Sequence, residues 1–412
     1  MNNRGQEYRV FISLIMAVAV IIPSPVFSCT IFSAKDKHGR MWAGNNEDFY
    51  WFDFSTQIRI VPKTDSTFSF IYFNYNNLDF PQGGVNGAGL FYDANMVEAS
   101  DVEGQNKKSN FPGETRELML NVLRHCKTVP EALLLFDKYY IPELRTGQIH
   151  LADKEGNMGI ITIDRSWLTS DHFQVSTNYN LSHQDDDYKK CWRYPIAYSM
   201  LRVADASLEL MTAICDSTCQ RKGVSTIYSN VHNLTSGEMW FYYGWDYDSP
   251  YKTTFEEMIA LGDTTIMMRE LFADQIVVKA YNAFAAGGFD AGLKILNTVG
   301  DARVKEEKLK LFLQGVLFDF ESFIKSEKIS VTKNEQLVRQ VIEASNNEDL
   351  LYIIANQNIS KTNKKLAEQK LRTIQTSGIS VGLISGVVLG GSSVVLLVFV
   401  LKNRKKGKLA VP

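Results

Sequence analysis

Apolar and polar residues alternate in short runs along residues 29–262, and turn residues separate the runs. A period of two is typical of strands with one buried face. The pattern predicts strands at 29–34, 40–44, 57–61 and 68–73, and hairpins that pair 148–152 with 159–163 and 225–231 with 238–243. Helical runs at 114–126 and 129–139 lie between them. Strands with interspersed helix pairs predict an α+β domain built in layers.

From residue 263 the spacing changes to that of helices. One apolar face recurs at intervals of three and four residues, formed by Leu309, Phe312, Leu313, Val316, Leu317 and Phe320. Further helices are predicted at 335–344 and 349–355. We therefore expect a small all-α domain at 263–372 and a linker at 373–377. The pattern does not separate an independent domain from a spacer that packs on the first domain.

The N-terminal end has the features of an export signal. Arg4 and Arg9 precede an apolar run at 10–22, which is too short to span a bilayer and is followed by two prolines. Ser28 is a small residue immediately before Cys29. This arrangement predicts a signal peptide at 1–28, so that the mature chain begins at Cys29. The alternative is a buried N-terminal helix.

The C-terminal end carries a second apolar segment, 378–401, with no charged residue and a basic tail at 402–412. It predicts one transmembrane helix, with the tail cytoplasmic and the catalytic domain outside the cell membrane. Gly382, Gly386 and Gly390 are spaced by four, a pattern that can pair two helices into a homodimer. The alternative is that glycine is simply frequent in membrane helices.

Composition and charge narrow the function classes. The chain has 412 residues, and 45% of them are hydrophobic, enough for one large core and a smaller second domain. The net charge of −2 gives no electrostatic reason to expect a nucleic-acid partner. No Cys/His cluster has zinc-ligand spacing, and we expect neither a metal nor a cofactor. Of the five cysteines, Cys215 and Cys219 are close enough in sequence to form a disulfide in an exported chain.

Cys29 is the candidate nucleophile. A cysteine that becomes the first residue has its own α-amine, with a reference pKa of about 7.7–8.0, within reach of its thiol. That amine can act as the general base near neutral pH. The segment Val26-Phe27-Ser28-Cys29 also resembles a bacterial lipoprotein cleavage site, where acylation would remove the base. Phe27 fits that site poorly, and a C-terminal anchor makes a lipid redundant.

Cys29-Thr30, a strand-turn-strand and then Gly44-Asn45-Asn46-Glu47-Asp48 follow in order. This order resembles the choloylglycine hydrolase, penicillin V acylase and isopenicillin N acyltransferase group of N-terminal-nucleophile (Ntn) hydrolases. The resemblance implies a four-layer αββα sandwich at 29–262, in which Asp48 holds the amine of the nucleophile. Asn45 stands where many bile-salt hydrolases and penicillin acylases carry an arginine. It is a substrate-binding candidate and favours the acyltransferase branch.

Three further residues match the group. The resemblance implies that the backbone amide near Asn95 and the side-chain amide of Asn178 stabilise the oxyanion, and that Arg193 supports the active site. Asn180, two residues after Asn178, is the alternative match. Without the resemblance, Asn178 could instead be a turn residue at the end of a strand. Arg193 could instead be a surface residue on a helix.

Aromatic residues follow the Asp48 motif, where the group has a loop that lines the substrate pocket. Phe49 and Trp51 are the substrate-binding candidates in the run Phe49, Tyr50, Trp51, Phe52 and Phe54. An apolar pocket would suit an acyl, aryl or steroid group. The alternative is that these side chains are anchors of the core or of an interface.

Together these features predict an exported, membrane-anchored amidase that acts on small N-acyl amides. Cys29 attacks the carbonyl of a linear, non-peptide C–N amide, and water or an amine acceptor releases the acyl-enzyme. One alternative is a dipeptidase-type Ntn enzyme, which also begins with cysteine. The other is a non-catalytic surface lipoprotein or binding module.

Overall fold

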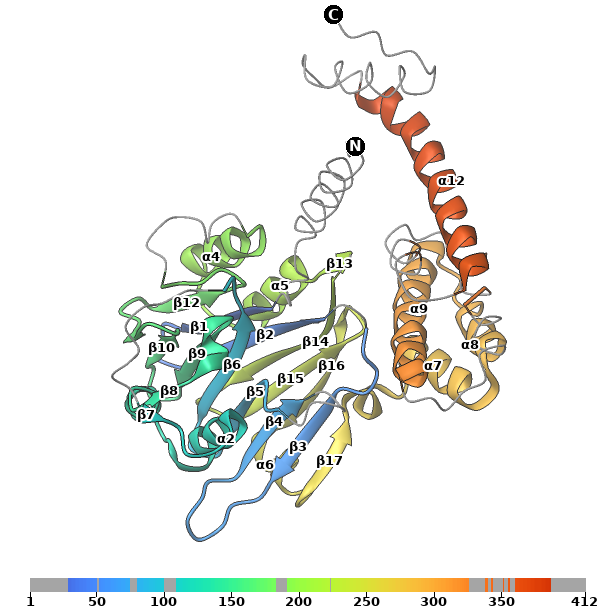
Figure 1. Ribbon diagram of the computed structural model, residues 1–412. Helices are drawn as coiled ribbons and strands as arrows, with labels where there is room; N and C mark the ends of the chain where they lie inside the picture. The colour runs from blue at the N-terminus through green and yellow to red at the C-terminus, as the bar shows by residue number, and fades with distance from the viewer. Residues whose placement is uncertain are drawn as a thin grey trace, which may run out of the picture. The chain divides into compact units, whose positions relative to one another are not determined.

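The computed structural model describes residues 29–49, 52–74, 80–99, 109–182, 191–222, 224–325, 338–339, 342–343, 351, 355 and 360–386. The chain divides into two compact units, Met1–Phe318 and Asp319–Pro412. The first unit contains two antiparallel sheets and the helices that pack on them (Figure 1). The predicted mixed α and β architecture is thereby confirmed.

The first sheet is built around the strand that follows Cys29. Its strand order is β12 (Phe173–Ser176), β1 (Thr30–Lys35), β2 (Met41–Phe49), β14 (Val224–Asn233), β15 (Glu238–Tyr243) and β16 (Asp246–Thr254), and β13 (Arg221–Lys222) pairs with β14. All of these pairs are antiparallel. Thr30 lies opposite Asn46, and Thr226 lies opposite Asp48. The register therefore brings the start of β1, the end of β2 and the start of β14 to one end of the sheet.

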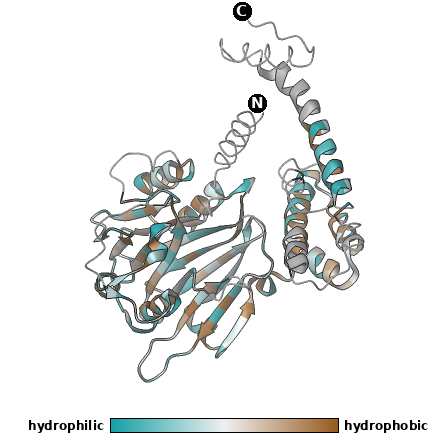
Figure 2. Ribbon diagram, in the orientation of Figure 1, coloured by the Kyte–Doolittle hydropathy of each residue, from teal (hydrophilic) through white to brown (hydrophobic). Residues whose placement is uncertain are grey.

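The second sheet has eight strands. Their order is β11 (Ser166–Leu168), β10 (Met158–Ile161), β9 (Gly147–Asp153), β6 (Leu90–Met96), β5 (Gly83–Asn86), β4 (Phe70–Asn74), β3 (Gln57–Val61) and β17 (Thr264–Met267). A separate parallel pair joins β7 (Ser109–Asn110) to β8 (Tyr139–Tyr140). Apolar and polar residues mix along the strands of both sheets (Figure 2), as expected where successive side chains point to opposite faces.

Two helix pairs cover the outer faces of the sheets. α2 (Thr115–His125) and α3 (Val129–Phe136) pack on the second sheet, where Leu90 and Tyr92 belong to their core cluster. α4 (Arg193–Val203) and α5 (Leu208–Thr218) pack on the first sheet over Trp42. The inner faces meet because β1 and β2 contact β9. The result is four layers in the order α, β, β, α, the arrangement that the resemblance implies.

Further helices follow the sandwich within the first unit. Short turns of helix also lie between the strands, at Pro142–Arg145 and Phe255–Ile259 (α6), and directly after β17, at Met268–Phe272. α7 (Ile276–Gly287), α8 (Phe289–Leu296) and the first part of α9 (Ala302–Lys325) come next. The structure places the boundaries differently from the predicted division at residue 263. β17 extends the second sheet to Met267, and the first compact unit ends at Phe318.

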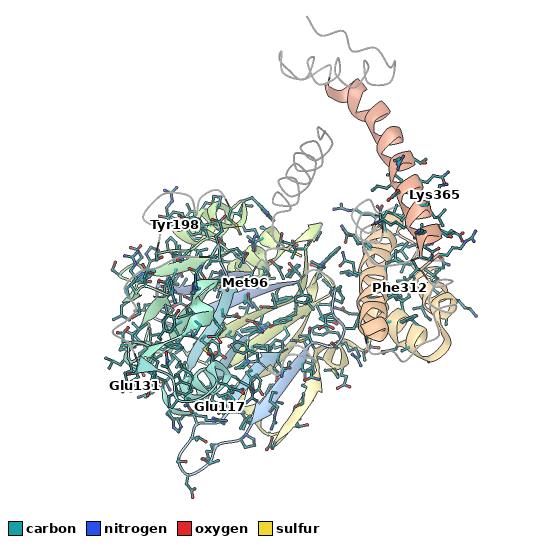
Figure 3. The ribbon with its side chains drawn as sticks, in the orientation of Figure 1. Met96, Glu117, Glu131, Tyr198, Phe312 and Lys365 are labelled. Carbon is teal, nitrogen blue, oxygen red and sulfur yellow. The ribbon has the colours of Figure 1, made fainter. Side chains whose placement is uncertain are left out.

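Aromatic side chains attach these helices to the sandwich. Phe54 stacks on Tyr281 of α7, with ring centroids 4.0 Å apart. Phe312 of α9, labelled in Figure 3, packs against Phe284 of α7. Phe52 and Phe54 are both fully buried, and their rings meet edge to face. For these two residues the alternative prediction, core anchors rather than pocket lining, is confirmed.

The ends of the chain are described only in part. α12 (Lys361–Gly386) runs through the predicted linker and includes Gly382 and Gly386. The predicted signal peptide at 1–28, the remainder of the predicted transmembrane segment with Gly390, and the basic tail lie outside the described residues. The described stretches contain no helix that is both long enough and apolar enough to cross a bilayer.

Gly315→Ala tests the packing of α9 on the sandwich. A Cβ at this position would lie 2.2 Å from the ring of Phe54, which cannot move freely because it stacks on Tyr281. We expect a loss of about 1–3 kcal/mol in the free energy of unfolding, despite the better helix propensity of alanine. Denaturant unfolding measures it. Gly300→Ala, with no atom within 4 Å of its Cβ, is the control. Equal stability of the two variants would contradict this packing.

Candidate active site

Cys29 lies directly before β1, at the end of the first sheet where β2 also ends. The residue is 3% exposed. Burial raises the pKa of its thiol well above the ordinary value, and the nearby charges of Glu47 and Asp48 raise this pKa further. The backbone N–H of Asp48 donates to the sulfur and opposes this effect. The surroundings therefore favour the thiol over the thiolate, so a nucleophile at this position needs a base.

Asp48 is fully buried at the end of β2. Its Oδ1 accepts a hydrogen bond from Thr226 Oγ1 at 2.5 Å, and its Oδ2 accepts one from Gln220 Nε2 at 2.9 Å. Arg193 Nη1 lies 3.3 Å from Oδ2. Burial raises the pKa of Asp48 to about 7, although the positive charge of Arg193 and both hydrogen bonds lower it. Desolvation therefore outweighs three favourable partners.

Arg193 joins the parts of the site. It is the first residue of α4 and is 2% exposed. Its Nη1 donates to the backbone oxygen of Cys29 at 2.8 Å and to Thr30 Oγ1 at 3.0 Å. Its Nη2 donates to Asn178 Oδ1 at 2.7 Å. With the ion pair to Asp48, one guanidinium thus brings together Cys29, Asp48 and Asn178, which are three of the predicted site residues. The alternative prediction of a surface arginine is wrong.

Asn178 follows β12 and bridges the two sheets. Its Nδ2 donates to the backbone oxygen of Met96 at 2.7 Å, at the end of β6 (Met96 is labelled in Figure 3). That N–H therefore points to a carbonyl in this structure. Asn180, the alternative match, is buried, and its Nδ2 has no hydrogen-bond partner. The role of either amide as an oxyanion donor stays a prediction.

The other predicted residues lie on the strands around this end. Asn95, on β6, is 3% exposed, and neither atom of its amide has a hydrogen-bond partner. Asn45, on β2, is fully buried and donates from Nδ2 to Glu47 Oε2 at 3.1 Å, whereas its Oδ1 has no partner. Phe49 is the last residue of β2 and is half-buried. Trp51 lies outside the described residues.

The sequence motifs drew no attention to Glu47 and Asp93 as members of the site. Both are buried, and the charge of each raises the pKa of the Cys29 thiol. Burial, and then the charge of Glu47, raise the pKa of Asp93 well above its usual range. Strand periodicity carried a signal, because Glu47 shares one face of β2 with Asn45, and Asp93 shares one face of β6 with Asn95. Which faces would meet was not readable from the sequence.

A second set of missed residues holds Asp48 from the far side. Thr226 Oγ1 accepts from the backbone N–H of Gln220, and both residues bond to Asp48. Trp245 Nε1 donates to the backbone oxygen of Thr226 at 2.9 Å. Lys310 of α9 lies over the Trp245 ring, 5.7 Å from its centroid. The helices after the sandwich therefore connect to the partners of Asp48.

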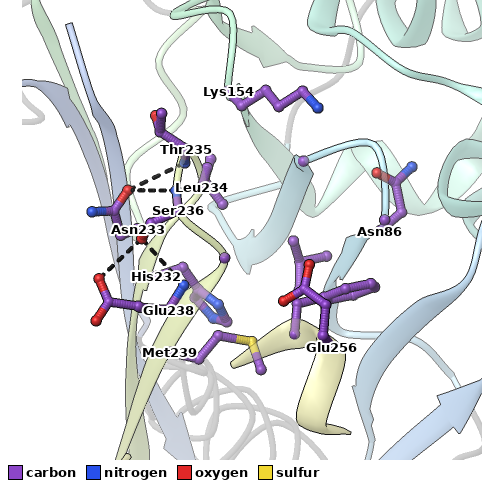
Figure 4. A pocket seen from close by; sticks show the side chains of 15 residues that line it. Asn86, Lys154, His232, Asn233, Leu234, Thr235, Ser236, Glu238, Met239 and Glu256 are labelled. Carbon is purple, nitrogen blue, oxygen red and sulfur yellow. Dashed lines mark hydrogen bonds between the residues drawn. The ribbon is translucent and has the colours of Figure 1, made fainter. Parts of the chain in front are cut away.

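A cavity of about 110 Å³ lies at the opposite end of β14, between the 86–89 and 233–238 turns and Lys154 (Figure 4). None of the predicted site residues lines it. Cys215 and Cys219, predicted to be able to pair, are both free thiols. Among the described residues, no group of histidine, cysteine or acidic side chains is arranged to hold a metal ion.

Neither a protein-family model nor a curated protein matches the chain. Penicillin V acylase from Agrobacterium tumefaciens is 16% identical, over 57% of this chain and 90% of that chain, with a TM-score of 0.46. Conjugated bile acid hydrolase from Clostridium perfringens is 14% identical, over 58% and 95%, with a TM-score of 0.44. The Caenorhabditis elegans orthologue of N-acylethanolamine-hydrolyzing acid amidase is 18% identical, over 50% and 93%, with a TM-score of 0.38.

The first two of these proteins have names that fall within the group that the sequence motifs resemble. At such identities and TM-scores, the similarities carry no weight in assigning a function.

The raised pKa of Asp48 predicts a pH-dependent stability. The ordinary pKa of Asp48 is 3.8, and its pKa in the folded chain is about 7. At pH values between these two, the folded chain keeps a proton on Asp48 that the unfolded chain has released. This stabilisation is complete below pH 3.8 and is lost as the pH rises through 7. It amounts to about 4 kcal/mol, at 1.36 kcal/mol per pKa unit. This pH dependence is predicted for the chain that still carries residue 28, in which Cys29 has no free α-amine.

Asp48→Asn removes the titrating group. We expect the wild-type free energy of unfolding to fall relative to that of Asp48→Asn between pH 4 and pH 7, measured by denaturant titration. Asp171→Asn, at an exposed position, is the control and should track the wild type. Parallel pH profiles for wild type and Asp48→Asn would show that the pKa of Asp48 is not raised.

Proposed function

We propose that this chain is an N-terminal-nucleophile amide hydrolase whose nucleophile is Cys29 after removal of residues 1–28. The observation that carries the proposal is the guanidinium of Arg193, which binds the Cys29 carbonyl, the Asp48 carboxylate and the Asn178 amide together. Burial of a charged arginine costs free energy. Stability alone therefore does not explain why Arg193 binds a cysteine backbone, an acid and an amide. Such an arrangement is expected where the position of the cysteine matters.

Removal of the preceding segment would arm the site. It creates an α-ammonium on Cys29 close to Asp48, whose backbone N–H bonds to the Cys29 sulfur. The opposite charge lowers the pKa of Asp48 and keeps its carboxylate ionised. The carboxylate in turn orients the amine. The processed chain therefore contains both the nucleophile and its base in one residue, held by a neighbouring acid and Arg193.

The reaction then proceeds through an acyl-enzyme. The neutral α-amine takes the thiol proton, and the sulfur attacks the amide carbonyl carbon. The carbonyl π electrons move to the oxygen, where amide donors stabilise the negative charge. The side-chain amide of Asn178 or of Asn180 and the backbone near Asn95 are the proposed donors. The tetrahedral species collapses, the C–N bond breaks, and the Cys29 ammonium returns its proton to the leaving amine.

Water completes the cycle. The regenerated α-amine removes a proton from water as it attacks the thioester, and the thiolate leaves and is reprotonated. An amine acceptor in place of water would give acyl transfer. The same proposal places the catalytic domain outside the cell membrane, because export and signal cleavage free Cys29. The apolar segment at 378–401 would anchor the chain there.

Cys29→Ser tests the nucleophile in the processed enzyme. We expect kcat/KM on N-acyl amides to fall by at least about 10³-fold, because a hydroxyl replaces the thiol in every turnover. Release of amine from a panel of N-acyl p-nitroanilides measures it. Cys191→Ser removes a cysteine that lies outside the proposed machinery, and its rate should match that of wild type. Unchanged activity of Cys29→Ser, with loss in Cys191→Ser, would exclude Cys29 as the nucleophile.

A further inference from the structure

Two carboxyl groups from different sheets meet beside Cys29. Glu47 lies on β2 of the first sheet, and Asp93 lies on β6 of the second sheet. Glu47 is 4% exposed and Asp93 is 1% exposed, and the charges of both act on the Cys29 sulfur. Two buried carboxylates at short range cannot both ionise cheaply. The proposed reaction uses neither group, so their position next to the nucleophile needs another explanation.

Several polar atoms in this region have no partner. Asp93 Oδ2, Asn45 Oδ1 and both amide atoms of Asn95 make no hydrogen bond. Asp93 Oδ1 accepts a hydrogen bond from the backbone N–H of Ala94, at 2.7 Å. Buried polar atoms in folded proteins are rarely left without a partner. Four such atoms on three neighbouring side chains indicate a place where a ligand supplies the missing hydrogen bonds.

Strand geometry directs these side chains to the space between the sheets. On β6, Leu90 and Tyr92 face the α2 and α3 helices, so Asp93 and Asn95 face the other way. On β2, Trp42 faces α4 and α5, so Asn45 and Glu47 also point inward. We call these four residues the acceptor cluster: Asn45, Glu47, Asp93 and Asn95. Its members therefore converge from both sheets.

The acceptor cluster is held in place. Asn45 Nδ2 donates to Glu47 Oε2 at 3.1 Å, and Asn45 also hydrogen-bonds Asp93. The Asp93 carboxyl lies across Gly83 on β5, where a Cβ would be only 2.6 Å from the carboxyl carbon. Only glycine leaves room for that carboxyl. Oriented acceptors on rigid strands are preorganised for one kind of group.

We propose that the acceptor cluster is a subsite for a protonated primary amine of the substrate, so that the preferred amides carry an ammonium group close to the scissile carbonyl. The inference rests on the proposed amide hydrolase function. An ammonium has three donors and no acceptor, which suits Asp93 Oδ2 and the carbonyl oxygens of Asn45 and Asn95. Its charge takes the place of the proton that the two acids otherwise hold, and a buried charge is tolerated when it is paired.

Substrate pairs on the processed wild-type enzyme test the subsite without any variant. Each pair has one amide with a primary ammonium and one neutral isostere in which methyl replaces the ammonium. One pair carries the group on the acyl side and the other on the amine side. We expect one ammonium amide to exceed its isostere by about 10²-fold in kcat/KM, as for a buried charge pair. If the neutral isostere of each pair has the same kcat/KM as the ammonium amide, the proposed subsite is wrong.

Asp93→Asn and Glu47→Gln keep the shape of the cluster and remove its charges. We expect each variant to lose most of the preference for the ammonium amide, read as the ratio of the two kcat/KM values, because any change at Cys29 acts on both substrates alike. Asp171→Asn is the matched control and should keep the preference. Equal losses on both substrates would assign the acids a structural role and contradict the proposal.

The two proposals fail in different ways. If Cys29-dependent cleavage of neutral amides is observed without any ammonium preference, the amide hydrolase stands and the subsite is wrong. If neither kind of amide is cleaved, or if cleavage survives Cys29→Ser, the hydrolase proposal fails first.

Gly83→Ala adds an independent check, because its Cβ displaces the Asp93 carboxyl. It should reduce the ammonium preference more than the neutral rate, and an undiminished preference would count against Asp93 as a ligand.

Discussion

The arrangement around Cys29 depends on one buried guanidinium. Arg193 is almost completely removed from solvent and donates to Cys29, Thr30 and Asn178 while it pairs with Asp48. A buried charge of this kind is stable only when its donors are satisfied in good geometry. The contacts extend from the start of β1 to the end of β2, the start of α4 and the segment after β12. The position of the cysteine is therefore set by elements far apart in sequence.

The carboxylate opposite Arg193 depends on a second layer of contacts. Thr226 and Gln220 bond to Asp48, and Trp245 bonds to the backbone of Thr226. Lys310 then packs on Trp245 from helix α9. The helices beyond the sandwich thus belong to the same compact unit as the site and reach the second layer around Asp48.

The order of short motifs, through the resemblance to a known group, pointed to Cys29, Asp48, Asn178 and Arg193. The structure brings these four residues together, and their roles stay predictions. Glu47 and Asp93 were not predicted, because they come together only when β2 and β6 face each other. The strand β17 was not predicted, because its pairing with β3 joins residues about 200 positions apart. Such long-range pairing is decided by tertiary packing rather than by local propensity.

The state of Cys29 during turnover tests the central claim most directly. The measurement is peptide mass mapping of the membrane-extracted protein after rapid acid quenching in the presence of an N-acyl amide substrate. The account predicts a peptide that begins at Cys29, with a free α-amine and an acyl group of the substrate's mass on its sulfur. A Cys29 that lies inside a longer peptide, or whose amine is itself acylated without substrate, would contradict the account. Either result would leave the proposed nucleophile without its base.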